Sequence, residues 1–139
     1  MPKAITPDLF INRELSLLQF NRRVLELAAD GSVPLLERLR FLCISSSNLD
    51  EFFEVRVARL QQQLKHDISP NDPAGMSAEE QLDAIAREAH KLVRDQYAQF
   101  NDTLIPLLKK EEIQFLRRSE WTEAQSQWLS NHFKRELAP

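Results

Sequence analysis

The sequence is poor in glycine and cysteine. Its 139 residues include two glycines, Gly31 and Gly75, and a single cysteine, Cys43. Two isolated glycines exclude a glycine-rich phosphate-binding loop, and one cysteine excludes an internal disulfide. Because Cys43 lies in the apolar stretch 41–44, we expect a packed small hydrophobe rather than a reactive thiol.

Long apolar runs and an excess of basic charge are also absent. No run approaches the roughly 18 apolar residues that span a bilayer, and the N-terminus carries Pro2, Lys3 and Pro7 in place of the apolar centre of a signal peptide. Eighteen basic and 21 acidic side chains leave a net charge of -3, which argues against nucleic-acid binding. These features predict a cytoplasmic protein without a transmembrane segment. Peripheral association with the inner membrane stays open.

Residue clusters that could carry catalysis are missing as well. His66, His90 and His132 lie far apart in the sequence, and no cysteine or carboxylate completes a metal-ligand spacing around them. Nothing marks a nucleophile elbow. We therefore expect no catalytic residue and no metal ligand in this chain. His90 could be a phosphotransfer histidine on a helical bundle, but a partly exposed helix histidine is the interpretation we favour.

Helical periodicity dominates what is present. Apolar residues make up 42% and charged residues 28% of the chain, the balance of a folded domain. Strand-type alternation is nearly absent, so we predict an all-α fold, an antiparallel helical bundle. Capping boxes are predicted at Ser16–Gln19, Ser77–Glu80 and Thr122–Gln125. Pro34 suits the start of a second helix, and Gly31 suits the left-handed position after the first.

Apolar stripes indicate which faces of these helices are buried. In the first helix the predicted face is Leu17, Phe20, Val24, Leu27 and Ala28, widened by Leu18 and Leu25. In a helix expected to begin near residue 49 and end near Lys65, it is Leu49, Phe52, Phe53, Val57, Leu60 and Leu64. The longest stripe runs from Leu82 to Leu104, and Pro106 is expected to kink that helix or lie near its end.

Three stretches interrupt the pattern. Residues 45–48 read Ser-Ser-Ser-Asn and predict a cap or break, or alternatively a corner that faces a ligand. Residues 66–76 contain Pro70, Pro73 and Gly75 and predict a loop. Residues 113–116 could form a lone strand, which needs a partner to be stable. We therefore expect a helical domain over residues 1–108, followed by the beginning of a truncated second domain over residues 109–139.

Several segments resemble the opening of bacterial polyphosphate kinases. The segments 12–25 and 34–42 match in order and spacing, and the strongest match is Ser47-Asn48-Leu49-Asp50-Glu51-Phe52-Phe53 followed by 55–57. The resemblance covers roughly residues 9 to 60 and becomes looser beyond them. One departure is Leu17, where the family usually has tryptophan.

The resemblance implies a function for a longer protein. Polyphosphate kinases reversibly transfer the terminal phosphate of ATP to polyphosphate through a phosphohistidine, with Mg²⁺, in C-terminal domains. A head domain serves dimerisation, so residues 109–139 would begin that domain and the whole enzyme would be a homo-oligomer. None of the three histidines matches the catalytic one, and the isolated fragment is expected to be inactive.

One site residue carries over from the family. The asparagine of its Asn-Leu-Asp-Glu-Phe motif contacts the nucleotide, and that position is Asn48. A carboxamide suits this role because it offers a donor and an acceptor to an adenine edge. Arg38, Arg40, Arg56 and Arg59 could face polyphosphate, although pairing with nearby acidic side chains is the interpretation we favour. The alternative functions are an independent helical interaction module and a phosphotransfer protein that uses His90.

Overall fold

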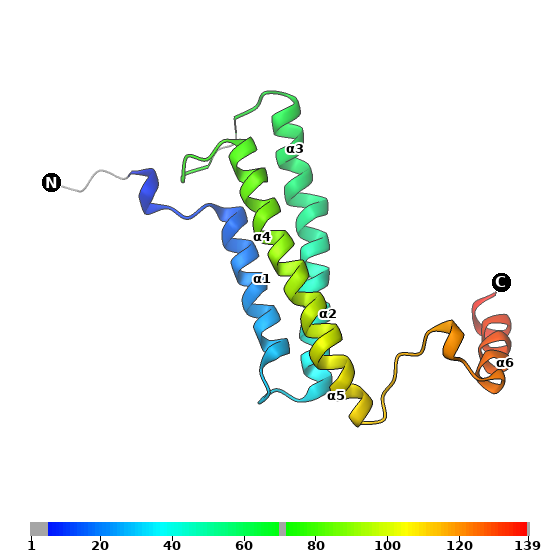
Figure 1. Cartoon of the computed structure of the whole chain (residues 1–139). Coiled ribbons are helices and arrows are strands. Elements are labelled where there is room, and N and C mark those ends of the chain that lie inside the picture. The colour runs from blue at the N-terminus through cyan, green and yellow to red at the C-terminus, as the bar shows by residue number, and fades with distance from the viewer. Residues whose placement is uncertain (1–5, 70–71, 139) are drawn as a thin grey trace.

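The protein is described here by a computed structural model that covers residues 6–69 and 72–138. Every regular element within these ranges is helical, and no strand occurs among them (Figure 1). The prediction of an all-α fold is confirmed. The bounds are η1 Pro7–Leu9, α1 Arg13–Ala29, α2 Leu35–Glu51, η2 Phe52–Val57, α3 Ala58–Lys65, α4 Ala78–Ala98, η3 Gln99–Leu104, α5 Ile105–Lys110, η4 Arg118–Glu120, α6 Glu123–His132 and η5 Phe133–Leu137.

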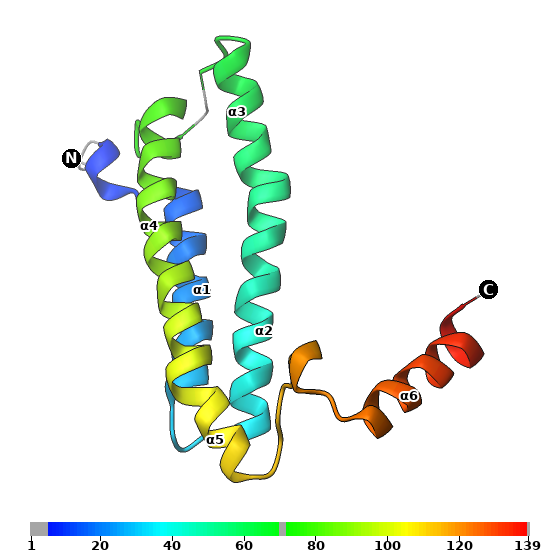
Figure 2. The same ribbon diagram turned by 45° about the vertical axis from the view of Figure 1, so that its right-hand side comes forward.

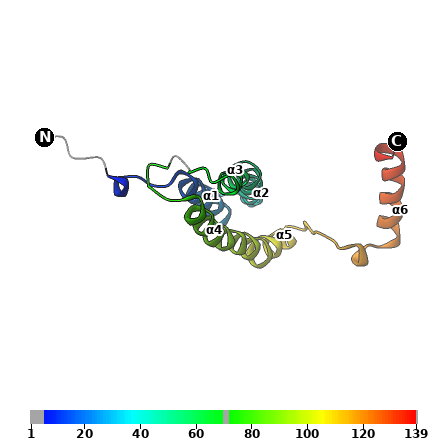
Figure 3. The same ribbon diagram turned by 90° about the horizontal axis from the view of Figure 1, so that it is seen from above.

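The helices join into rods, and each rod runs antiparallel to the one before it in sequence, so the first and third rods run in the same direction. α1 forms the first rod, α2, η2 and α3 follow without interruption as the second, and α4, η3 and α5 form the third (Figure 2). Seen end-on, the rods pack side by side, whereas α6 lies apart from them (Figure 3). No helix of the described residues is both long enough and apolar enough to cross a bilayer.

The core lies along the line where the rods meet. All three rods contribute buried aliphatic and aromatic side chains. Burial of each larger apolar side chain stabilises the folded state by about 1.5–3 kcal/mol. The buried core cluster comprises Leu18, Leu25, Ala28, Leu49, Phe52, Val57, Leu60, Ile85, Ala89 and Leu92.

α1 begins earlier than predicted and buries only part of the predicted apolar face, namely Leu18, Leu25 and Ala28. Its N-cap is Asn12, whose Oδ1 accepts from the backbone N–H groups of Glu14 and Leu15 at 3.0 Å each. The predicted cap, Ser16, lies one turn inside the helix. The buried stripe is Leu18, Asn21, Leu25 and Ala28, so the polar Asn21 takes a core position and the wider stripe that begins at Leu17 and Phe20 lies mostly outside.

Two other expectations near α1 and α2 are wrong. Gly31 does not adopt a left-handed conformation, because α1 ends on Asp30 in an extended conformation. The carbonyl of Ala28 instead accepts from Arg38 Nε at 2.9 Å and from Gln99 Nε2 at 2.9 Å. Cys43 is exposed rather than packed, since the α2 face that meets α1 passes through Arg38 and Ser45.

The predicted break at residues 45–48 does not exist. α2 runs through it to Glu51, and the helix widens afterwards, in the π-helical segment η2. There the Ala58 N–H reaches back five residues to the Phe53 carbonyl. The serines stay helical because Ser45 is fully buried and finds hydrogen-bond partners on α1 and α4. The predicted end of this rod at Lys65 is confirmed.

The third rod agrees more closely with the sequence. Ser77 and Glu80 form the predicted capping box, and the described residues between 66 and 76 form a loop; Pro70 lies outside the described residues. Pro106 lies near the end of the rod, in α5. It is the second residue after the π-helical segment η3, and its missing N–H removes one helical hydrogen bond there.

Residues after Lys110 leave the bundle. The predicted strand at 113–116 is absent from the described structure, and these residues have no regular secondary structure. Phe115 meets Phe100 edge-on with centroids 6.2 Å apart. The Thr122–Gln125 capping box at the start of α6 is confirmed. We call residues 113–138 the C-terminal arm. The division into domains at residue 108 stays a prediction.

Candidate functional site

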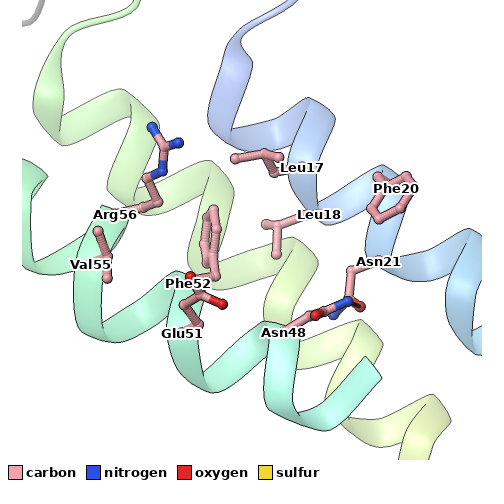
Figure 4. A pocket seen from close by; sticks show the side chains of 9 residues that line it. All are labelled: Leu17, Leu18, Phe20, Asn21, Asn48, Glu51, Phe52, Val55 and Arg56. Carbon is pink, nitrogen blue, oxygen red and sulfur yellow. Dashed lines mark hydrogen bonds between the residues drawn. The ribbon is translucent and has the colours of Figure 1, made fainter. Parts of the chain in front are cut away.

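A pocket opens between α1 and the α2–η2 rod. It has a volume of about 310 Å³ and is lined by Leu17, Leu18, Phe20, Asn21, Asn48, Glu51, Phe52, Val55 and Arg56 (Figure 4). The two helices bring these residues together because α1 and α2 are joined by a short turn and pack antiparallel. We call this space the α1–α2 pocket.

Apolar and polar side chains occupy different parts of the pocket. Leu17 and Phe20, which the sequence placed on the core face, are exposed on the pocket wall. Phe52 is buried behind it and meets Phe53 edge-on. Asn21 and Asn48 meet at one end, and Arg56 lies at the other (Figure 4). The pocket therefore offers apolar surface for a flat ring and a carboxamide for its edge.

Asn48 is half-buried and faces Asn21 across the helix interface. Its Nδ2 donates to Asn21 Oδ1 at 3.3 Å. Asn21 in turn donates from its Nδ2 to the backbone carbonyl of Ser45 at 2.8 Å, and Gln96 Nε2 of α4 donates to the Ser45 hydroxyl at 2.9 Å. Ser46 and Ser47, which precede Asn48 in the sequence, are exposed. Ser45 is the serine that connects to Asn48, through Asn21.

The four arginines that the sequence offered for polyphosphate have different partners, and only Arg56 lines the α1–α2 pocket. Arg38 is buried and caps the C-terminus of α1 through Ala28. Arg40 lies 3.6 Å from Glu37, the local pairing that was favoured. Arg56 Nη1 lies 3.7 Å from Glu14 Oε1 on α1. Arg56 and Arg59 both line a second hollow, beside the start of α1.

The histidines lie away from this pocket. His90 is exposed on α4, and His132 stacks on Trp128 in α6 with centroids 5.1 Å apart. No group of three or more potential metal-ligating side chains occurs within the described residues. Carboxyl groups with a lowered pKa also lie elsewhere: hydrogen bonds from Ser32 lower the pKa of Asp30, and a hydrogen bond from Lys91 lowers that of Glu88.

Comparison with known proteins decides the family. The sequence profile of the polyphosphate kinase N-terminal domain matches residues 10–116. The chain belongs to the polyphosphate kinase N-terminal domain family. Asn48 and all other residues of the α1–α2 pocket lie within the matched range.

Curated relatives and a crystal structure agree with this assignment. The polyphosphate kinase of Paraburkholderia phytofirmans is 51% identical over 129 residues, which is 93% of this chain and 19% of the relative. The polyphosphate kinase of Burkholderia multivorans is 49% identical over 129 residues, again 93% of this chain and 19% of the relative. A crystal structure of polyphosphate kinase from Porphyromonas gingivalis superposes with a TM-score of 0.72 and 33% identity, over 92% of this chain and 18% of that one. The chain thus spans about a fifth of the length of these polyphosphate kinases.

Asn21 is the pocket residue that sequence reasoning missed. It interrupts an otherwise apolar stripe in which Leu18, Leu25 and Ala28 are spaced by helical turns. A polar residue at a core position of a helix needs a partner, and that conflict was the available signal. The apolar stripe through Leu17 and Phe20 suggested a different buried face, on which Asn21 would not lie.

Proposed function

We propose that the α1–α2 pocket holds the adenine of ATP, and that the chain is the N-terminal part of an ATP:polyphosphate phosphotransferase. The observation that carries this proposal is Asn48, half-buried in the wall of a pocket with apolar and polar sides in a polyphosphate kinase N-terminal domain. Had its side chain been enclosed among helices with no adjoining space, the motif would have had only a structural role.

The size and chemistry of the pocket suit a nucleobase. Small-molecule sites are concave, largely apolar and about 300–1,000 Å³ in volume, and this one is about 310 Å³. Leu17, Phe20 and Phe52 supply apolar and aromatic surface for a purine ring. Asn48 supplies the amide group that can pair with a purine edge through a donor and an acceptor.

The phosphate chemistry would take place outside this chain. In the proposed reaction the terminal phosphoryl group moves from ATP to a histidine nitrogen, ADP leaves, and the phosphoryl group then moves to the end of a polyphosphate chain. Mg²⁺ and the phosphates would be held by the remaining domains, in a homo-oligomer. The part described here would hold the base and be inactive alone, because base binding without phosphate contacts positions no reacting atom.

The test uses the full-length enzyme with Asn48→Ala. Losing a paired base contact of about 1–3 kcal/mol predicts a KM for ATP raised roughly five- to 150-fold, with a smaller change in kcat at saturating ATP. Steady-state synthesis of polyphosphate measures both constants. Asn101→Ala is the matched control, because Asn101 is exposed and donates only to Tyr97 of its own helix. An unchanged KM for ATP in Asn48→Ala would contradict the proposal.

A further inference from the structure

The carboxamide of Asn48 is held by a chain of buried amide groups. Asn48 donates to Asn21 at 3.3 Å, and Asn21 donates to the Ser45 carbonyl at 2.8 Å. Asn21 is 4% exposed and Ser45 is 0% exposed. The chain of hydrogen bonds thus starts deep in the interface and ends at the pocket, where Asn21 and Asn48 meet (Figure 4).

The chemistry of the groups determines their orientation. A backbone carbonyl can only accept, so Asn21 must turn its amide nitrogen toward Ser45. Its Oδ1 then faces Asn48 and can only accept as well. Asn48 must therefore present its own nitrogen to Asn21. A rotation of the Asn48 amide by 180° would place two carbonyl oxygens against each other next to a buried group, which is unfavourable.

This orientation leaves Asn48 with a defined pair of free groups. Within the described residues the Asn48 Oδ1 accepts no hydrogen bond, and only one of the two Nδ2 hydrogens is needed for the contact with Asn21. Adenine offers a complementary edge, with the 6-amino donor next to the N1 acceptor. A 6-oxo purine has the opposite order, an O6 acceptor next to an N1–H donor. An amide free to rotate would pair with either edge, whereas a held amide favours one.

We propose that Asn21 is a positioning residue that makes the α1–α2 pocket select 6-aminopurine over 6-oxopurine nucleotides by holding the Asn48 amide in one orientation. The inference rests on the proposed adenine site, and it adds the device that gives that site its base preference. Asn21 acts through Asn48 and needs no contact with the nucleotide itself.

The test compares ATP with ITP in the full-length enzyme. ITP differs from ATP only at the base edge, where it has a 6-oxo group and a protonated N1. The sugar and the phosphates are the same. We expect the wild-type enzyme to have a kcat/KM for ATP at least tenfold above that for ITP. Asn21→Leu keeps a similar side-chain volume but removes both amide groups, and we expect it to lower this ratio at least fivefold. The ratio is a readout that a purely structural role would not move.

Gln96→Leu is the matched control. Gln96 is buried and contacts the Ser45 hydroxyl at 2.9 Å, but it touches neither Asn21 nor Asn48 through any assigned hydrogen bond. We expect Gln96→Leu to lower the unfolding midpoint while the ATP:ITP ratio stays within twofold of wild type. An equal fall of the ATP:ITP ratio in both variants would overturn the inference, because general loosening of the helix interface would then explain the fall.

Further outcomes separate this inference from the proposed site. If Asn48→Ala raises the KM for ATP while Asn21→Leu keeps the wild-type ratio, the site stands and the positioning role is wrong. If Asn48→Ala leaves the KM unchanged, the proposed site itself fails. A wild-type enzyme that uses ITP as well as ATP overturns the inference without any variant, which covers the case in which Asn21→Leu does not fold.

Discussion

At the scale of single residues, Asn12 has a role that its position in the sequence concealed. It caps α1 with its Oδ1, and its Nδ2 donates to Asp72 Oδ2 at 3.0 Å, which ties the start of α1 to the loop before α4. Ser16-Leu17-Leu18-Gln19 satisfies the capping-box pattern in letters, whereas Asn12 has Leu15 in place of the required Glu or Gln. The distinction comes from tertiary structure, because Asn12 is 5% exposed and its second contact is 60 residues away.

A pair of alanine variants tests this assignment. Asn12→Ala should lower the free energy of unfolding by about 1–2 kcal/mol, as for loss of a helix cap. Ser16→Ala, at an exposed position inside α1, should change it by less than about 0.5 kcal/mol. Urea denaturation followed by circular dichroism measures both. A loss at Ser16 as large as that at Asn12 would contradict the observed start of the helix.

The candidate site was predictable in part at this scale. The family motif identified Asn48, and the structure places Asn48 in a pocket, although its nucleotide contact stays a proposal. Asn21 was not identified, because an asparagine in an apolar stripe has no motif to mark it. Its partner, the Ser45 carbonyl, is 24 residues away, and a single sequence does not reveal which helices meet.

At the scale of elements, the π-helical segment η2 explains why Phe53, one of the predicted core positions of the second rod, is exposed. Regular α-spacing from Leu49 selects Phe53 and Val57, but the structure buries Phe52 and Val57 and leaves Phe53 41% exposed. A π-helical turn contains an extra residue. The buried positions Leu49, Phe52, Val57 and Leu60 are therefore spaced by three, five and three residues.

Deletion of one residue from η2 tests this account. Removing the exposed Glu54 would change the spacing to three, four and three, which a regular α-helix keeps on one face. We expect the bundle to fold with its stability changed by about 1 kcal/mol or less. Cooperative thermal unfolding and one-dimensional proton spectra of the methyl groups report the outcome.

The control is a deletion in regular helix. Removing the exposed Ser47 from α2 rotates Leu49 and everything after it by about 100° relative to Ser45. Loss of two buried side chains costs about 3–6 kcal/mol, so this variant should be largely unfolded. Equal damage from both deletions would mean that the π-helical turn is not a tolerated insertion.

Agreement between prediction and structure also differs among elements. The capping boxes of α4 and α6 were recognised because both caps are local, formed within four residues. The break at residues 45–48 was wrong because the serines and Asn48 were judged by local competition for backbone groups. In the folded chain Ser45 is satisfied from α1 and α4 instead, so helix α2 continues.

At the scale of the whole molecule, the bundle and the C-terminal arm differ in how they are held. The rods share a buried core, and Arg22 of α1 pairs with Asp95 of α4 at 2.7 Å. The arm exposes Trp128 and Phe133 by 63% and 57%, and a hollow of about 400 Å³ lies between Trp121, Trp128 and Leu116. Its contact with the bundle includes the Phe100–Phe115 pair.

Truncation after Glu112 tests whether the bundle is stable without the arm. The Phe100–Phe115 contact is worth about 0.5–1.5 kcal/mol, so residues 1–112 should unfold at a temperature within about 10 °C of residues 1–139. Circular dichroism at the helical wavelength measures both midpoints. Loss of cooperative unfolding in the shorter chain would show that the arm completes the core and would contradict the predicted boundary near residue 108.

The sequence by itself determined that this protein is helical, where α4 and α6 begin, and which family it belongs to, because these depend on periodicity, local caps and motif order. Only the tertiary structure decided that residues 45–48 continue a helix, that Asn12 and Asn21 take buried positions, and that Asn48 lies in a pocket. The physical reason is that a polar group's cost depends on its hydrogen-bond partners, and here those partners are 24 to 60 residues away.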